Sequence, residues 1–228
     1  MISSKVESAS LAETAYAAIR DGILRGQRPL GSPLSRRQLA AELKMSVVPV
    51  ADALQRLEND GLIESRPRVG TRVRVPSAQD IRGHYVVREA LESQSARLFA
   101  ERATAEERDE IKRMAARLDA MYADYAGETH SPEEWFRLHQ EHLRFHMRVA
   151  ECCGYEALCV AIQRNQILIF NWLYDTAADR RTMPPNHHGR LAKSLCSQDP
   201  LVADKSMRLH VAHGRDEVLA TLEKLTSK

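Results

Sequence analysis

The sequence predicts a mainly α-helical protein with one small β-hairpin. Three short helices and the hairpin are expected in residues 1–76, and an all-α bundle of about six helices in residues 77–228. Apolar residues recur every three or four positions over most of the chain, which is the helical period. A pair of short alternating segments lies just before residue 76, and stretches with Gly and Pro separate the helical segments.

The composition is that of an ordinary globular protein. With 228 residues, of which 43% are hydrophobic and 28% charged, the chain can bury a sizeable core. No run of about 18 apolar residues occurs, and the N-terminus "MISSKVESAS" lacks the pattern of a secretion signal. We therefore expect a cytoplasmic protein with no membrane partner.

The cysteines and the charges narrow the class of protein. The four cysteines lack paired CxxC spacing, so we expect reduced thiols and no zinc finger; they are Cys152, Cys153, Cys159 and Cys196. Residues 1–76 hold 12 Lys and Arg against 8 Asp and Glu, and the remainder holds 21 against 23. A basic first part suits a nucleic-acid-binding module, although a difference of this size is also common in ordinary enzymes.

The first part contains the spacing of a helix-turn-helix. Leu11, Ala15, Ile19 and Ile23 form the apolar stripe of a first helix, which ends near "RGQRPLGSP". Ser35 is placed to cap a second helix, "RRQLAAELK", and Ser46 a third, "VVPVADALQRLENDG", with Pro49 tolerated in its first turn. Two short helices joined by a tight turn predict a helix-turn-helix.

A basic hairpin follows these helices. "LIES" and "TRVRV" alternate as two short strands do, and "RPRVG" between them supplies a turn with Arg66, Arg68 and Gly70. Three helices and such a wing predict a winged helix, whose third helix enters the DNA major groove while the wing reaches phosphates or the minor groove. The alternative is a small helical subdomain with a solvated basic loop.

The stretch "LSRRQLAAELKMSVVPVADALQRLENDGLIESRPRVGTRV" resembles the winged helix of GntR-type bacterial transcription regulators. The family pattern Ser-Arg-Thr-Pro-Val-Arg-Glu-Ala-Leu corresponds here to residues 46–54, with Val47 and Ala51 in place of its two arginines, whereas Arg37 keeps a position that contacts DNA in the family. The resemblance implies a homodimer on a pseudo-palindromic double-stranded DNA operator. The DNA-contacting residues it implies are Arg36, Arg37, Ser46, Val47, Val48, Arg66, Arg68 and Gly70.

The second part reads as helices separated by five breaks, "RAT", "AGETHSP", "CCGY", "TAADRRTMPPN" and "CSQDP". We expect one buried face to carry Val87, Leu91, Ala96 and Leu98, and the next to carry Ile111, Met114, Leu118 and Met121. Trp135 and Trp172 are expected in the core.

Four histidines form a candidate metal site. His142 and His146 share one helix face in "HLRFH", His188 opens the next-to-last helix, and His210 lies on the last. Imidazoles from three inward-facing helices can converge on one metal ion in a bundle. The alternative is a set of surface or satisfied core histidines, because one pair four residues apart is a weak signal.

From about residue 78 the chain resembles the ligand-binding domain of the FadR-type branch of the same regulators, in "DIRGHYVVREALESQSARLFAERAT", "FHMRVAECCGYEAL" and "SMRLHV". Many members hold a divalent metal with one Asp and three His. Laid on this sequence, the ligands are His146, His188 and His210, with His142 at the Asp position. An all-histidine set favours a transition metal, foremost Zn or Ni. His139, His187 and His213 are expected to be neighbours rather than ligands.

The resemblance also places Arg88 over the same cavity, where a guanidinium can bind the carboxylate of an effector. The alternative is a surface arginine paired with Glu92 one turn away. The function expected is that of a transcription regulator, a repressor, whose second domain binds a metal and a small organic acid. We expect no catalytic residues; the rival functions are a histidine-ligated metal-dependent hydrolase, for which "HLRFH" lacks the Glu of H-E-x-x-H, and a direct metal sensor.

Overall fold

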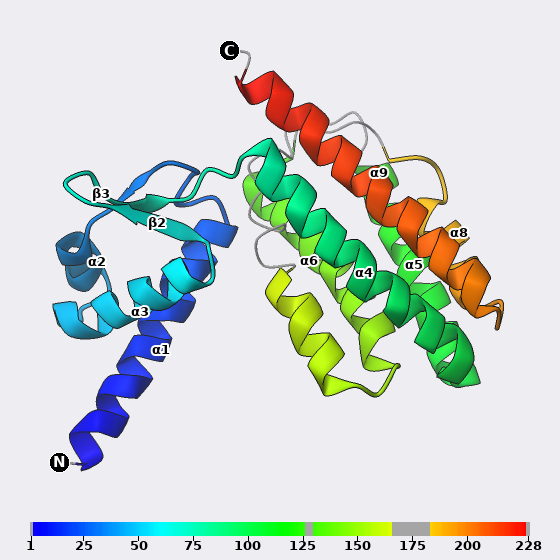
Figure 1. Ribbon diagram of the computed structural model, residues 1–228, viewed down its shortest axis with the longest axis horizontal. Helices are drawn as coiled ribbons and strands as arrows, with labels where there is room; N and C mark the ends of the chain where they lie inside the picture. The colour runs from blue at the N-terminus through cyan, green and yellow to red at the C-terminus, as the bar shows by residue number, and fades with distance from the viewer. Residues whose placement is uncertain (1, 126–129, 166–182, 227–228) are drawn as a thin grey trace. The chain divides into compact units, whose positions relative to one another are not determined.

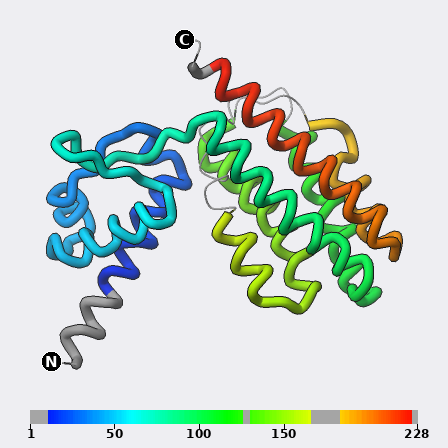
Figure 2. The backbone as a smooth tube through the Cα atoms, viewed as in Figure 1, coloured from blue at the N-terminus to red at the C-terminus, as the bar shows by residue number. Residues whose placement is uncertain are grey.

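The computed structural model describes residues 2–125, 130–165 and 183–226 (Figures 1 and 2). The chain divides into two compact units, Met1–Val75 and Pro76–Lys228. The division falls one residue before the boundary that the sequence predicts.

The first unit opens with three helices, α1 (Ile2–Leu24), α2 (Arg36–Glu42) and α3 (Val47–Asn59). The Ser35 hydroxyl caps α2 by accepting from the backbone N–H of Gln38 at 3.4 Å. Ser46 occupies the cap position of α3, but its side chain makes no capping hydrogen bond, unlike the prediction. Helix α1 packs against α3. Ile19 and Ile23 are buried as expected, whereas Leu11 is 40% exposed, so the buried stripe does not extend to it.

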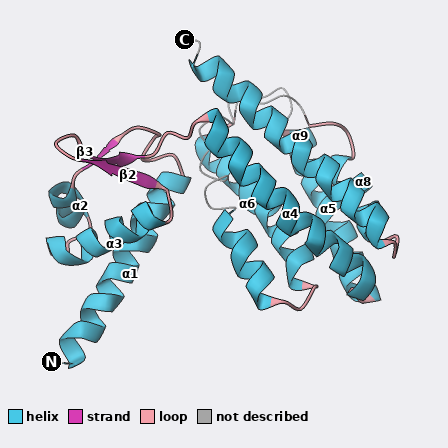
Figure 3. Cartoon of the chain, viewed as in Figure 1, coloured by secondary structure: helices cyan, strands magenta, loops and turns pink. Residues whose placement is uncertain are grey.

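A three-stranded antiparallel sheet completes this unit (Figure 3). The predicted hairpin is present as β2 (Ile63–Arg66) and β3 (Gly70–Val73), with Ile63 opposite Val73. The third strand, β1 (Pro33–Leu34), pairs with the other side of β3 and was not predicted. Two residues are too short to show strand alternation, and a proline is tolerated there because β1 is an edge strand.

The second unit is all helical in the part that the structure describes. Its helices are α4 (Ala78–Arg102), α5 (Ala105–Asp124), α6 (Pro132–Glu151), a helix over residues 156–165, α8 (His187–Leu195) and α9 (Pro200–Thr226). Capping boxes start α4, α5 and α6 at Ser77, Thr104 and Ser131. The predicted breaks "RAT", "CCGY" and "CSQDP" fall between these helices, whereas most of "AGETHSP" and of "TAADRRTMPPN", together with Trp172, lies outside the described residues.

The helices of this unit pack around one apolar core. Helix α4 lies along α9, and α5 contacts both α6 and α8 (Figure 1). Large buried side chains include Phe99, Ile111, Phe145, Leu195 and Val211. No described helix is long and apolar enough to cross a membrane.

The buried face of α4 differs from the prediction. Val87 is 47% exposed and Leu91 and Leu98 are half-buried, whereas Ala96 is buried as predicted. Ile81 and Tyr85, which were not predicted, are buried. The inward positions that follow carry Arg88 and Glu92, which are 6% and 1% exposed. Because two charged residues occupy buried positions, a search for apolar periodicity misplaces the first half of the buried face of this helix.

Candidate metal centre and nucleic-acid interface

Three histidines of the second unit converge within its interior. His142 and His146 lie one turn apart on α6, and His210 comes from α9. The Nε2 atoms of His142 and His146 are 2.9 Å apart, and those of His146 and His210 are 3.1 Å apart. Within the described part of the chain, these three form a group whose ligand atoms all lie within 4.8 Å of one another.

The fourth predicted ligand, His188, lies beside this group rather than inside that distance. Its ring centroid is 4.9 Å from that of His142 and 5.3 Å from that of His210. Its Nδ1 lies 2.8 Å from Oδ1 of Asp119, so Nδ1 donates its proton to the carboxylate and Nε2 carries the lone pair. That Nε2 is buried and has no hydrogen-bond partner among the described residues.

Three polar side chains hold the imidazoles from outside. Besides Asp119 on His188, the Tyr122 hydroxyl lies 3.1 Å from Nδ1 of His142. Oε2 of Glu92 lies 2.8 Å from Nδ1 of His146, so the carboxylate favours a proton on that nitrogen. Partners of this kind fix the orientation and tautomer of a metal-binding imidazole, and they leave Nε2 as the ligand atom.

Arg88 lies next to this set and is buried with Glu92. Its Nε donates to Oε1 of Glu92 at 2.7 Å, and its Nη2 lies 3.5 Å from Nε2 of His146. The pairing with Glu92 is therefore present, but it is not on the surface. A buried guanidinium held by its own carboxylate is oriented toward the imidazoles.

The protonation states suit metal binding at neutral pH. Burial, reinforced by the neighbouring imidazoles, holds the pKa of His142 and of His210 well below 6.5. Burial also lowers the pKa of His188, although Asp119 acts in the opposite direction. Burial would raise the pKa of Glu92, but the charge of Arg88 and the contact with His146 lower it to about 2. The rings of His142, His188 and His210 are therefore neutral and the Glu92 carboxylate is charged, as ligands and their partners require.

The residues present fit a divalent transition metal. With its proton on Nδ1, His146 offers a single lone pair at Nε2, and the Nε2 atoms of His142 and His210 and the Arg88 guanidinium all approach it. One lone pair cannot accept from three donors, whereas one cation can accept lone pairs from all three imidazoles. The observed spacings are near the roughly 3.0–3.4 Å between adjacent nitrogen ligands that each lie about 2.1 Å from one ion, in octahedral or tetrahedral geometry.

Asp119 and Tyr122 were not among the predicted site residues. Glu92 was named only in the alternative in which it pairs with Arg88 on the surface. Asp119 follows the buried Leu118 on α5. Its position beside an apolar stripe was the one sequence feature that could have pointed to it. The outer carboxylates also change the charge balance, because Glu92 and Asp119 supply the negative charge that the all-histidine ligand set lacks.

The remaining predicted neighbours separate into two groups. His139 is buried against Trp135, with ring centroids 6.2 Å apart, and does not join the set. His187 lies 4.6 Å from His210 and 4.8 Å from His213, measured between ring centroids, so both of these half-buried rings flank the site. Burial lowers the pKa of His187 to about 4.

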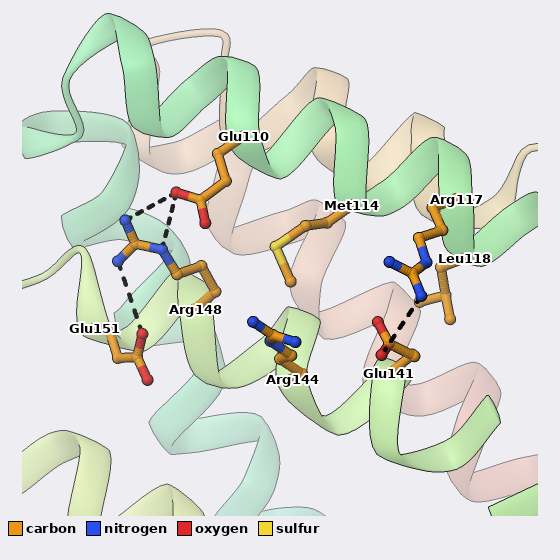
Figure 4. A pocket seen from close by; sticks show the side chains of 8 residues that line it. All are labelled: Glu110, Met114, Arg117, Leu118, Glu141, Arg144, Arg148 and Glu151. Atoms are coloured by element: carbon orange, nitrogen blue, oxygen red, sulfur yellow. Dashed lines mark hydrogen bonds and ion pairs between the residues drawn. The ribbon is translucent and has the colours of Figure 1, made fainter. Parts of the chain in front are cut away.

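A charged groove of about 560 Å³ lies between α5 and α6, and no member of the histidine set is among its lining residues (Figure 4). Arg148 is bound there by Glu110 at 2.9 and 3.0 Å, and Arg117 lies 3.8 Å from Glu141. Two of the three arginines that line the groove, Arg117 and Arg148, therefore already have carboxylate partners from the protein, and we assign no ligand to this groove.

The predicted DNA-contacting residues are all exposed in the first unit. They come from the start of α2, the start of α3 and the turn between β2 and β3, and comprise Arg36, Arg37, Ser46, Val47, Val48, Arg66, Arg68 and Gly70. Arg68 and Gly70 adopt positive φ angles of 64° and 100°, which closes the turn and projects the wing. Arg66 lies 3.5 Å from Glu64, a solvent-exposed contact that DNA can displace.

A winged helix with exposed arginines, joined to an all-α domain with a buried histidine set, defines a protein of the DNA-binding regulator class. The family model "Bacterial regulatory proteins, gntR family" matches residues 11–73, and the FCD domain model matches residues 84–213. The chain belongs to the gntR family of bacterial regulatory proteins, in the branch that carries an FCD domain. This is a family of transcription regulators and not of enzymes, so the hydrolase alternative is dropped.

Two curated relatives are similar to part of this sequence. The chain is 40% identical over 91 residues to the "Probable D-xylose utilization operon transcriptional repressor" of Paenarthrobacter nicotinovorans, covering 38% of this chain and 40% of that protein. It is 37% identical over 95 residues to an uncharacterized HTH-type transcriptional regulator of Agrobacterium vitis, covering 42% of this chain and 56% of that protein. The chain thus spans only about half of these relatives, or less.

Solved structures resemble the whole fold at low identity. A GntR transcriptional regulator from Rhodococcus sp. RHA1 has a TM-score of 0.75 at 20% identity, covering 92% of this chain and 98% of that one. The E. coli protein McbR/YncC has a TM-score of 0.69 at 18% identity, covering 95% and 98%. At these identities the likeness shows the fold alone.

Proposed function

We propose that the protein is a transcriptional repressor that binds a pseudo-palindromic operator as a homodimer through its first unit. The observation that carries this proposal is the exposed arginine set at the start of α2 and in the wing, displayed on a winged helix of the gntR family. Arg36, Arg37 and Arg68 make no ion pair among the described residues, so their charges are available to phosphates. The exposed Ser46 hydroxyl is uncommitted as well.

The second unit, in this proposal, holds one divalent transition metal, Zn or Ni foremost, through His142, His146, His188 and His210. The support is the convergence of imidazole nitrogens, the outer partners that turn Nε2 inward, and the unpartnered Nε2 of His188. When bound, such an ion supplies a positive centre that can accept a carboxylate oxygen.

The effector is a small organic acid, and the buried charges support this choice. Arg88 contributes one positive charge, Glu92 and Asp119 contribute two negative charges, and a divalent ion adds two positive charges. One positive charge remains in a buried region, where electrostatic interactions are stronger than in water. A carboxylate that meets the ion and the Arg88 guanidinium would neutralise it, and its binding would change operator affinity through a coupling between the two units.

Two measurements test this function. Selection from random duplexes with the full-length protein should enrich one palindromic sequence, and enrichment of none would refute specific DNA binding. Thermal shift with candidate carboxylates, with and without a chelator, should show stabilisation that depends on metal. Carboxylate stabilisation that survives complete metal removal would contradict the effector arrangement.

Direct metal sensing is the second candidate, because the four imidazoles of the second unit can supply the ligands of an ion without any organic effector. It predicts that added metal alone changes operator affinity. Operator binding measured with and without the ion, in the absence of organic acids, separates the two candidates.

A further inference from the structure

The start of α3 exposes two adjacent valines to solvent. Val47 is 44% exposed and Val48 is 63% exposed, in the first turn of the helix. The inward face of α3 is formed by other side chains, Val50, Ala53, Leu54 and Leu57, which are all at most 3% exposed. The two valines therefore contribute little to the core of this unit and face outward from it.

The outward face of α3 carries no basic side chain in its first two turns. Beyond the valines it presents Ala51 and the exposed Asp52, and the first arginine of the helix, Arg56, is bound to Glu13 of α1 at 2.6 Å. Arginine pairing with the edge of guanine, the commonest specific contact in the major groove, is therefore not available at the start of this helix.

The charges around the valines nevertheless favour DNA as the occupant. Arg36 and Arg37 are exposed at the start of the preceding helix, and Arg66 and Arg68 in the wing of the same unit. These basic groups of the same unit can bind phosphates, while the exposed patch at the start of α3 is apolar. In the major groove the one apolar group on a base edge is the 5-methyl group of thymine.

We propose that Val47 and Val48 read the 5-methyl groups of thymines in the operator, in place of arginine contacts to guanine. The inference rests on the proposed DNA binding by the first unit and adds the chemistry by which that surface selects its sequence. The operator half-site should contain thymine at the positions that face the start of α3, with sequence-independent phosphate contacts on either side.

Replacing thymine by deoxyuridine tests this directly, because the two bases differ only by the methyl group. In the duplex enriched by selection, each thymine is replaced in turn and the affinity is measured by fluorescence anisotropy. Loss of one buried methyl contact should weaken binding about fourfold, and about sixteenfold when both half-sites are changed. The effect should be confined to one or two positions of the half-site.

The valine variants decide whether α3 is responsible. Val47→Ala and Val48→Ala should reduce the preference for thymine over deoxyuridine at those positions to near unity, and their melting temperatures should stay close to that of the original protein because both side chains are exposed. Val75→Ala, at an exposed valine of the same unit that lies beyond β3, is the matched control and should keep the full preference.

The possible failures are distinguishable. If a specific duplex is bound but no thymine position responds to deoxyuridine, the methyl readout is wrong and the proposed DNA binding stands. The same conclusion holds if the alanine variants retain the full preference. If selection enriches no sequence, both the readout and the specific binding are wrong.

Discussion

Asp119 of α5 contacts His188 of α8 twice. Its Oδ1 accepts from the backbone N–H of His188 at 3.0 Å and lies 2.8 Å from the Nδ1 atom of the same residue. Its Oδ2 accepts from the backbone N–H of Gly189 at 2.8 Å. One carboxylate therefore caps the start of α8 and also orients the imidazole. The geometry of the histidine set is thereby tied to the position of a whole helix.

Replacing this carboxylate should weaken metal binding without removing a ligand. In Asp119→Asn, the His188 imidazole loses its charged partner, and substitutions of this kind typically lower metal affinity about 10- to 100-fold. Competition with a chromophoric chelator measures the change. Asp109→Asn, at an exposed carboxylate of the same helix, should leave the affinity unaltered, and an equal loss there would assign the effect to α5 as a whole.

Removing a ligand should lower metal content and stability together. Purified protein is expected to carry about one ion per chain, and His146→Ala should abolish this because it removes a ligand. The variant should also be less stable, because metal binding contributes to folding free energy. His139→Ala is the matched control, since His139 is an equally buried histidine of α6 outside the set. It should lower the melting temperature while leaving metal content, measured by elemental analysis, unchanged. Loss of metal in both variants would contradict the assignment.

Changing the charge of the ligand set should change effector binding. His142→Asp should retain the metal but weaken carboxylate binding, because the introduced negative charge competes with that of the effector. Calorimetric titration measures this, and equal or tighter binding would refute the charge balance proposed above. Arg88→Ala is a poorer test, because it leaves Glu92 buried without its guanidinium, a change that typically costs about 3–5 kcal/mol of stability.

Arg37 should contribute to operator binding. Arg37→Ala is expected to weaken binding by about 1–3 kcal/mol if the guanidinium reads a base, or to reduce the salt slope by about one unit if it contacts a phosphate. Binding isotherms at several salt concentrations distinguish these cases. Arg25→Ala, at an arginine paired with Asp21 on α1, should alter neither quantity.

The cysteines should be unreactive in the native protein. Burial raises the pKa of Cys152 and of Cys153 to about 12, so at pH 8 only about one molecule in ten thousand carries the thiolate that reacts. Alkylation followed by mass spectrometry should label these two positions slowly in buffer and rapidly in denaturant. Rapid labelling of native protein would show that the 150–154 segment opens readily.

The helical breaks and the hairpin could be predicted because each has a local signal, whereas the four-histidine set was predicted from the family resemblance. Turn residues mark the ends of α4, α5 and α6, and the i,i+4 spacing of His142 and His146 fixes their common face. The missing parts lack such signals. Strand β1 is too short to alternate, and the role of Asp119 depends on a contact between residues 69 positions apart. The inward face of α4 was predicted correctly at Ala96 but not at Val87, because Arg88 and Glu92 occupy two of its buried positions.

The pairing of β1 with β3 has a consequence for how the first unit can meet a duplex. Strand β1 leads through Ser35 directly into α2, while β3 begins at the wing turn, so the arginines of both places are attached to adjacent strands of one sheet. The backbone N–H of Gly31 also donates to the carbonyl of Val73 at 2.9 Å, which extends the pairing beyond β1. The distance between the two arginine groups is therefore restrained by the sheet. When both groups contact one duplex, the groove width of the DNA has to adjust to this distance. Sequences that deform easily should therefore bind more tightly, independent of any base contact.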